Sequence, residues 1–320
     1  MGEITLSVVV PLFNEEDSIR AFHRRLDSVL QGLSSSFEII YVDDGSTDLT
    51  LEILLEISRH DRLTVIQLSR NFGHQAALTA GIDEANGEMV ITMDGDGQHP
   101  PELIPSMIAK CQEGFDIVQM QRFDDRKVPF FKRVTSDMFY WIINKLGDTR
   151  IEAGTSDFRL MTHKVVLAMR ELREVHRVIR GLIPWLGFTK ADIPYHPEKR
   201  IAGKSKYTFG KMFTLAENAI FSFSLVPLRI GLIAGSFFLL LALIEALYVL
   251  SFWVTGRQHL LAPGWSSIVF LILVSAGFLM VLISVLGIYI GQIYQEVKGR
   301  PLYIVQKIFN RANVRTENQE

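Results

Sequence analysis

The sequence lacks the features that mark several protein classes. Its 320 residues include one cysteine, Cys111, so an internal disulfide is excluded, and we interpret this residue as part of a buried helix. The formal net charge of −2 excludes a general nucleic-acid binder, because affinity for a phosphate backbone requires a dense basic surface. The N-terminus has neither the basic start nor the apolar stretch of a signal peptide. We therefore expect the part before the first long apolar run to stay in the cytosol.

Two long apolar runs near the C-terminus are the most distinctive feature of the chain. They cover roughly residues 230–254 and 268–291, and about 20 helical residues are enough to cross the ~30 Å hydrocarbon core of a bilayer. Lysine and arginine residues precede the first run and follow the second, whereas the connector at 255–264 has Arg257 as its one firm positive charge. The run lengths predict two transmembrane helices, and the positive-inside rule predicts that both termini are cytoplasmic. We expect the protein in the inner (plasma) membrane.

Small and ionisable residues within these runs bear on assembly. Glu245 lies in the middle of the first run, where a charge is costly; a packing contact at a subunit interface and a role near the lipid remain equally open. The GxxxG patterns at 231–235 and 287–291 permit close helix approach, either within the hairpin or between subunits. We expect a homo-oligomer formed through the transmembrane helices.

The first part of the chain alternates short β-rich runs with helical patterns, such as the amphipathic stretch at 18–30. Continuous apolar strands separated by helices predict a mostly parallel sheet covered on both faces, whose ligands bind beyond the carboxyl ends of the strands. The expected strands are residues 6–10, 38–42, 63–68, 89–93 and 117–120.

Polar motifs follow three of these strands directly. They are PLFNEE at 11–16, DDGSTD at 43–48 and DGDGQH at 94–99. Any one of them alone is best interpreted as a turn with an aspartate helix cap, but three at one edge predict a single site. Asp94 and Asp96 offer paired carboxylates, and Gln98 adds a neutral oxygen, which suits Mg²⁺ or Mn²⁺ gripping a substrate phosphate.

Two further stretches, 128–146 and 207–226, have aromatic residues at helical spacing with lysine and arginine nearby. Ordinary core helices would show the same spacing, but the composition favours amphipathic helices in the membrane interface. The histidines His74 and His99 lack the spacing of a metal site, and we interpret His74 as structural.

Five motifs in order resemble the polyprenyl-phosphate glycosyltransferases of glycosyltransferase family 2, which include dolichol-phosphate mannose synthases and bacterial undecaprenyl-phosphate glucosyltransferases. The motifs are VVVPLFNE at 8–15, DDGS at 43–46, DGDGQHP at 94–100, GTSDFR at 154–159 and RIAGKSKY at 200–207. The resemblance implies an α/β fold of the GT-A (Rossmann-like) class with interfacial amphipathic helices and a C-terminal two-helix transmembrane hairpin. We expect a catalytic domain at 1–205, an interfacial helix at 206–228, the hairpin at 229–292 and a cytoplasmic tail at 293–320.

The resemblance also implies roles for individual residues. The nucleotide-sugar pocket comprises Pro11, Phe13, Asn14, Glu15, Asp43, Asp44, Asp94 and Ser205. Asp94, Asp96 and Gln98 form the metal and diphosphate site, while Arg200 and Lys206 grip phosphate from a loop in which Gly203 permits folding over the sugar donor. Arg and Lys are natural partners of phosphate oxygens, although an ordinary solvated basic stretch remains an alternative.

Asp157 is the candidate general base in this resemblance. A lipid phosphate monoester has a second pKa of about 6 and is already largely an anionic nucleophile at neutral pH, so we prefer an orienting or electrostatic role and place base catalysis second. Cations suited to the acceptor phosphate, or simply to a charged surface, are Arg122, Arg126, Lys132 and Arg133.

The expected activity is inverting transfer of a single hexose to undecaprenyl (polyprenyl) phosphate at the cytoplasmic membrane face, giving a β-linked product. UDP-glucose is the first choice of sugar donor, followed by GDP-mannose or a UDP-amino-sugar. A processive polysaccharide synthase would normally show a Gln-x-x-Arg-Trp motif and more spans. A non-catalytic flippase component is the other alternative, against which the intact Asp-x-Asp motif argues.

Overall fold

The computed structural model describes residues 5–33, 35–60, 63–123, 154–174, 177, 179–198, 226–256 and 264–310. The chain divides into two compact units. Unit 1 comprises Met1–Trp141, Thr149–Phe209 and Arg300–Glu320, and unit 2 comprises Ile142–Asp148 and Gly210–Gly299.

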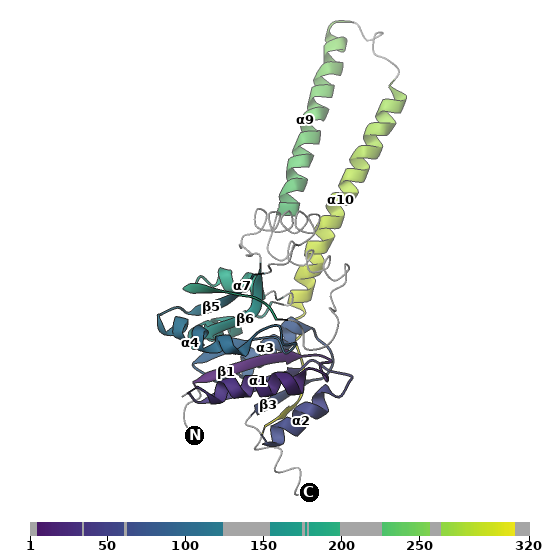
Figure 1. Ribbon diagram of the computed structural model, residues 1–320. Helices are drawn as coiled ribbons and strands as arrows, with labels where there is room; N and C mark the ends of the chain where they lie inside the picture. Colours follow the sequence, from purple (N-terminus) through teal and green to yellow (C-terminus); the bar gives the residue numbers. More distant parts are fainter. Residues whose placement is uncertain are drawn as a thin grey trace. The chain divides into compact units, whose positions relative to one another are not determined.

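Unit 1 is built on an eight-stranded mixed sheet with the strand order β7-β5-β6-β4-β1-β2-β3-β8 (Figure 1). The strands are β1 (Leu6–Leu12), β2 (Phe37–Asp43), β3 (Leu63–Leu68), β4 (Met89–Thr92), β5 (Ile117–Arg122), β6 (Thr155–Thr162), β7 (Lys190–Tyr195) and β8 (Val305–Phe309). The central strands β4, β1, β2 and β3 are parallel, whereas β6 is antiparallel to both β4 and β5, and β8 is antiparallel to β3.

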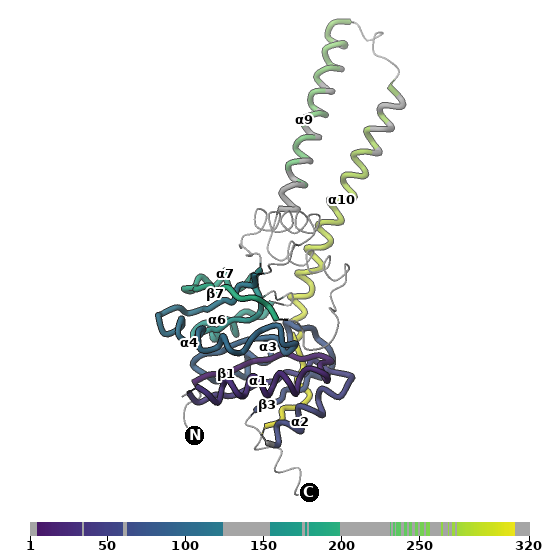
Figure 2. The backbone as a smooth tube through the Cα atoms, in the orientation of Figure 1, coloured from purple at the N-terminus to yellow at the C-terminus, as the bar shows by residue number. Residues whose placement is uncertain are grey.

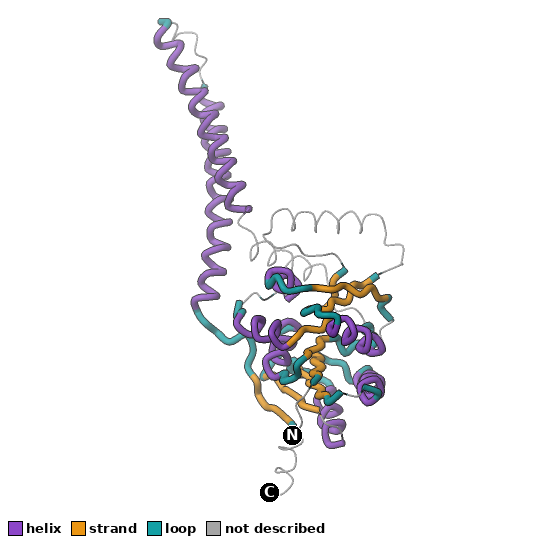
Figure 3. Tube along the Cα trace, turned by 90° about the vertical axis from the view of Figure 1, so that its left-hand side faces the viewer, coloured by secondary structure: helices purple, strands orange, loops and turns teal. Residues whose placement is uncertain are grey.

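Helices cover both faces of this sheet, which Figure 3 shows as a layer of strands between helices. Their bounds are α1 (Ile19–Gln31), α2 (Thr50–His60), α3 (His74–Glu84), α4 (Ile104–Gln112), α6 (His163–Glu171) and α7 (Ile179–Trp185), with a short 3₁₀ helix at Pro101–Leu103. All seven residues of β1 are buried. Val8 packs in the core that includes the apolar stripe of α1, and Val9 packs against α3. A Cβ at Gly81 would lie 2.2 Å from Val9 Cγ1, so glycine allows α3 to pack closely against the sheet.

The α/β class and the five expected strands are confirmed, but the sheet is mixed rather than mostly parallel. Three strands were not predicted from the sequence: β6, β7 and β8. The β6 sequence TSDFRLMT carries charged residues at buried positions, so it does not read as an apolar run. β7 is an edge strand containing Pro194, and it is only partly buried. Edge strands tolerate proline because one side of their backbone has no strand partner.

Residues 300–310 belong to unit 1, although they follow the last long helix of unit 2. Figure 2 shows the C-terminal strand β8 beside β3, and Ser69 N donates a 2.9 Å hydrogen bond to Ile304 O just before this pairing begins. The segment expected as a tail at 293–320 therefore includes a strand of the sheet. Residues 311–320 lie outside the described part.

Unit 2 contains two long helices, α9 (Val226–Val254) and α10 (Trp265–Val297), which contact each other. Both expected apolar runs are thus helical. Of the residues that the structure describes, one stretch, Val274–Val297, is long and apolar enough to cross a membrane. The predicted transmembrane hairpin is therefore not confirmed. The expected interfacial helix at 128–146 lies outside the described residues, as do the side chain of Glu245 and all of the second expected interfacial helix, 207–226, except its last residue.

Candidate active site

The polar motifs converge at the carboxyl edge of the sheet, as their positions in the sequence predict. β1, β2 and β4 are parallel neighbours, so the loops that follow them start side by side. β6 runs antiparallel to β4 with Thr92 opposite Arg159, which brings the beginning of β6, and with it Asp157, to the same edge. Thr92 Oγ1 donates a 2.6 Å hydrogen bond to the carbonyl of Asp157.

The loop after β1 is bound to the loop after β2. Asn14 has a left-handed backbone conformation with φ of 53°, and its Oδ1 accepts a 2.8 Å hydrogen bond from Thr47 N. Ser46 Oγ accepts from Asn14 N at 3.0 Å, and Thr50 Oγ1 accepts from Glu15 N at 2.8 Å. These contacts give the two loops of the expected nucleotide pocket a fixed geometry. Pro11, also expected in this pocket, lies buried within β1, and Phe13 follows the strand.

Asp43 and Asp44 are both buried and bind backbone N–H groups. Asp43 accepts from Ser46 N at 3.2 Å, while the two oxygens of Asp44 accept from Phe72 N at 2.7 Å and Gly73 N at 2.9 Å. Burial raises the pKa of each carboxyl, against the opposing effect of these hydrogen bonds. Gly45 has φ of 66°, and a Cβ there would lie 2.5 Å from a backbone carbon of the loop before α3, so the chain requires glycine at this turn.

The loop after β4 holds the expected metal ligands. Asp96 Oδ1 accepts a 2.9 Å hydrogen bond from Gln98 N, which closes a tight turn. His99 is buried and stacked on Phe158, and its Nδ1 accepts from Asp94 N at 2.9 Å. Burial lowers the pKa of His99 despite the neighbouring carboxylates, so its neutral form supports the backbone at Asp94. His99 therefore helps to hold the backbone of this loop in place.

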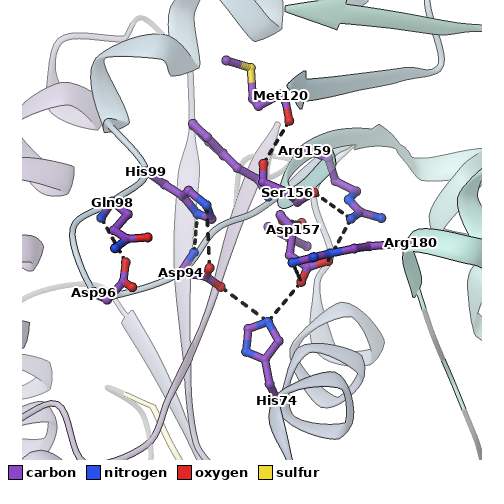
Figure 4. Close-up of polar contacts among 12 residues, drawn as sticks. His74, Asp94, Asp96, Gln98, His99, Met120, Ser156, Asp157, Arg159 and Arg180 are labelled. Atoms are coloured by element: carbon purple, nitrogen blue, oxygen red, sulfur yellow. Dashed lines mark hydrogen bonds and ion pairs between the residues drawn. The ribbon is translucent and has the colours of Figure 1, made fainter. Parts of the chain in front are cut away.

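Asp157 is the centre of a charged cluster, shown in Figure 4. Its Oδ1 accepts from Arg159 Nη2 at 2.8 Å, and Arg180 places Nη2 2.9 Å from Oδ2 and Nε 3.3 Å from Oδ1. His74 Nε2 lies 3.4 Å from Asp157 Oδ2. Burial opposes ionisation of Asp157, but Arg180, His74 and Arg159 together hold the pKa of its carboxyl well below the usual range. Asp157 is therefore a carboxylate throughout the neutral pH range.

His74, the first residue of α3, connects Asp157 to the loop after β4 (Figure 4). Its Nε2 also lies 3.4 Å from Asp94 Oδ1. Burial alone would lower the pKa of His74, but Asp94 and Asp157 raise it to about 9, so the ring is an imidazolium at neutral pH. Our interpretation of His74 as purely structural overlooked its position in this cluster, and Arg180 was not predicted at all. The available signal for His74 was its place just after the carboxyl end of β3, at the edge where the other motifs lie.

The remaining predicted residues are placed only in part. Arg122 is exposed at the end of β5, and its backbone N–H donates to Gly154 O at 2.9 Å. The other expected phosphate-binding residues lie outside the described residues: Arg126, Lys132, Arg133, Arg200, Ser205 and Lys206.

The oxygen-rich loop after β4 fits a divalent cation that completes its coordination with substrate. Within the described ranges, no group of three or more His, Cys, Asp or Glu side chains could hold a metal ion. However, Mg²⁺ commonly takes one or two protein carboxylates and completes its coordination with phosphates and water. Asp94 Oδ1 is buried and forms no hydrogen bond among the described residues, although His74 Nε2 lies 3.4 Å away, and a cation bound by this loop would give it a ligand bond.

Comparisons with known proteins agree on one family of glycosyltransferases. The model of "Glycosyl transferase family 2" matches residues 7–170. An uncharacterized glycosyltransferase of Bacillus subtilis, YkcC, is 40% identical over 98% of this chain and 96% of its own length. The SfII prophage-derived bactoprenol glucosyl transferase of Shigella flexneri is 38% identical over 94% of this chain and 97% of its own. A prophage bactoprenol glucosyl transferase homolog of Escherichia coli is 36% identical over 95% of this chain and 99% of its own.

Proposed function

The chain belongs to glycosyl transferase family 2, and from this premise we propose that it transfers one hexose from a nucleotide diphosphate sugar to polyprenyl phosphate. The observation that carries the proposal is its similarity, over nearly the whole chain, to bactoprenol glucosyl transferases. The match includes the region of the long apolar helices as well as the catalytic unit, so the likeness extends to the part of the chain suited to a lipid substrate.

A membrane location follows from the same comparison and from α10. The stretch Val274–Val297 exposes large apolar side chains, among them Leu279, Met280 and Ile283. An apolar surface of this kind is stable when lipid or another protein covers it. We propose that α10 anchors the enzyme at the cytoplasmic face of the inner membrane. The two-span topology with cytoplasmic termini and the homo-oligomer formed through these helices are part of the same proposal.

The sugar donor binds at the loops after β1 and β2 in this proposal. Asn14 and Glu15 lie in the loop after β1, and Asp43 is the last residue of β2. Hydrogen bonds between these residues and the loop after β2 hold the two loops in place, which favours a pre-formed nucleotide pocket. The names of the similar glucosyl transferases support glucose as the transferred sugar, so UDP-glucose is our first choice of sugar donor. GDP-mannose and a UDP-amino-sugar are the alternative donors.

Asp94, Asp96 and Gln98 would hold Mg²⁺ or Mn²⁺ beside the diphosphate. When bound, the cation would neutralise negative charge that develops on the departing nucleotide diphosphate. Arg200, Ser205 and Lys206 would bind the same phosphates, and Arg122, Arg126, Lys132 and Arg133 would attract the phosphate of the lipid.

The chemical step in this proposal is in-line attack by an oxygen of the lipid phosphate on the anomeric carbon. The bond from that carbon to the nucleotide diphosphate breaks, and inversion gives a β-linked product from an α-linked donor. The acceptor needs little help in losing a proton, because its second pKa is about 6. Asp157 is a poor base in any case, since three neighbouring cations favour its ionised form. We therefore assign Asp157 an orienting and electrostatic role.

A donor screen with purified protein and undecaprenyl phosphate tests this proposal. Each radiolabelled nucleotide sugar is incubated with Mg²⁺ or Mn²⁺, and the label is partitioned between organic and aqueous phases. The proposal predicts UDP-glucose-dependent label in the organic phase. Label in a water-soluble polymer would instead indicate a processive synthase. Absence of transfer with every donor, while the purified protein remains folded, would favour a non-catalytic flippase component.

A further inference from the structure

Neutralising the charge of Asp157 does not by itself account for the position of Arg180 in the charged cluster. Arg180 lies in the first turn of α7, a helix that contacts β6, and it approaches Asp157 with two nitrogens at 2.9 and 3.3 Å (Figure 4). Its side chain is 40% exposed, whereas those of Asp157 and Arg159 are 2% and 1% exposed. Arg180 is thus the arginine of this cluster that solvent, and therefore a substrate, can reach.

The charge balance of the cluster favours an anionic ligand. Two guanidinium groups, those of Arg159 and Arg180, pair with the single carboxylate of Asp157. Arg159 already neutralises Asp157 from within the core at 2.8 Å. The guanidinium of Arg180 is therefore held in a fixed orientation at the edge of the site, next to a local excess of positive charge.

We propose that Arg180 is a phosphate-binding residue of the transfer site and that Asp157 fixes the direction of its guanidinium. This inference rests on the proposed function. A planar guanidinium suits the oxygens of a phosphate, and anchoring by a buried carboxylate lowers the entropy lost when the ligand binds. Asp157 is then a positioning residue for Arg180, a role that requires it to stay ionised.

In the proposed reaction, two phosphate-containing groups meet in this site: the phosphate of the acceptor lipid and the diphosphate of the sugar donor. The strand order places β6 on the side of β4 away from β1 and β2, whose loops form the expected nucleotide pocket. β5, which ends at the exposed Arg122, is the next strand on that same side. We therefore expect Arg180 to bind the acceptor phosphate.

The test compares R180Q, R180K, D157N and the double variant R180Q/D157N with the wild type. R20Q is the matched control, because Arg20 is also partly exposed and paired with a carboxylate, that of Glu56, on the outer surface of α1 and α2. Steady-state transfer is measured while undecaprenyl phosphate is varied at saturating sugar donor, and then with the two roles exchanged. Thermal unfolding is recorded for every variant.

R180Q should raise the apparent KM for the lipid about 10- to 100-fold, the range expected for loss of a charge-assisted contact, with the donor KM within about 2-fold of wild type. R180K keeps the charge but loses the planar fork, so an intermediate effect is expected. The double variant should be little worse than R180Q, because removing Arg180 already removes what Asp157 positions. R20Q should behave as the wild type.

The possible outcomes distinguish the acceptor phosphate from the donor diphosphate, and a failure of the role of Arg180 from a failure of the proposed function. A rise in the donor KM alone would support phosphate binding and identify the donor diphosphate as the ligand. Folded R180Q and R180K with both constants unchanged would overturn the proposal, as would fully additive effects of R180Q and D157N. If the wild type itself transfers no sugar to the lipid under any donor, the proposed function fails, independently of Arg180.

Discussion

Asp44 accepts a 2.9 Å hydrogen bond from the backbone N–H of Gly73, the residue immediately before α3. The second oxygen of Asp44 binds Phe72 N, so this carboxylate ties the loop after β2 to the start of α3. His74 follows at once and faces both Asp94 and Asp157. One aspartate of the DDGS motif therefore helps to position the charged cluster as well as the loop of the nucleotide pocket.

We predict that Asp44→Asn destabilises unit 1 and weakens donor binding. An asparagine side chain has one acceptor oxygen, so one of the two partly buried backbone N–H groups would lose its partner, at a cost of about 1 kcal/mol. Denaturant unfolding measures the stability, and titration with UDP measures binding. Glu113→Gln, at an exposed ion pair on the surface, is the control. Unchanged stability and UDP affinity in Asp44→Asn would contradict this role.

Asp96→Asn should reduce transfer on the order of 100-fold or more while leaving the fold intact, because an amide keeps the shape of the side chain but binds a divalent cation more weakly. Transfer is measured across a range of Mg²⁺ and Mn²⁺ concentrations. Asp192→Asn, at an exposed position on β7, should retain wild-type metal dependence. Wild-type turnover of Asp96→Asn at limiting metal would show that Asp96 is not a ligand.

Asp157→Asn should lower turnover without recovery at alkaline pH. The acceptor phosphate, with a second pKa of about 6, is already largely ionised at pH 7, so raising the pH to about 9 cannot replace a side chain whose role is positioning. The measurement is a pH series at saturating metal and sugar donor. Strong recovery at high pH, with the lipid KM unchanged, would support general-base catalysis instead.

The lowered pKa of Asp157 predicts an acid-dependent loss of stability. In the unfolded chain an aspartate titrates near ~3.9, whereas in the folded protein Asp157 titrates lower, so its ionised form stabilises the fold above ~3.9 and this contribution disappears as the pH falls through the folded value. Asp157→Asn should therefore be less stable than the wild type at pH 7, and the difference should shrink as the pH falls below ~3.9. Equal stability of the two proteins at pH 7 would contradict the shift.

Tyr303→Phe should loosen the C-terminal strand. Tyr303 donates a 2.6 Å hydrogen bond to Asp83 at the end of α3, close in the chain to where Ile304 accepts from Ser69 N. Loss of the hydroxyl should cost about 1 kcal/mol and speed hydrogen exchange at the Ser69 amide. Tyr294→Phe, at an exposed position in α10, is the control. Unaltered exchange at Ser69 in Tyr303→Phe would show that this contact does not hold the strand.

The sequence was sufficient to predict the central strands and the edge at which the motifs meet. Continuous apolar runs such as VVVPL in β1 signal strands buried on both faces, and their polar ends mark the site directly. β6 could not be recognised in this way, because it buries two charged residues, Asp157 and Arg159, whose charges are compensated by each other and by Arg180 and His74. Charge compensation of this kind depends on contacts in three dimensions and leaves no periodicity in the sequence.

His74 and Arg180 illustrate the same limit for the site. They come from α3 and α7, and what unites them is contact with the buried Asp157. β8 was missed because it follows a 33-residue apolar helix, so its short alternating sequence VQKIF carried little weight beside that signal. Local sequence patterns thus identify the loops of the site, whereas tertiary contacts determine which charged residues lie beside those loops.

The most direct test of the account is mass spectrometry of the lipid product formed by the purified full-length protein from UDP-glucose and undecaprenyl phosphate. The account predicts a single new species, heavier than the acceptor by one hexosyl unit, whose formation requires a divalent cation and whose anomeric configuration by NMR is β. A ladder of species with several sugars, an α-linked product, or sugar found only in water-soluble material would contradict it.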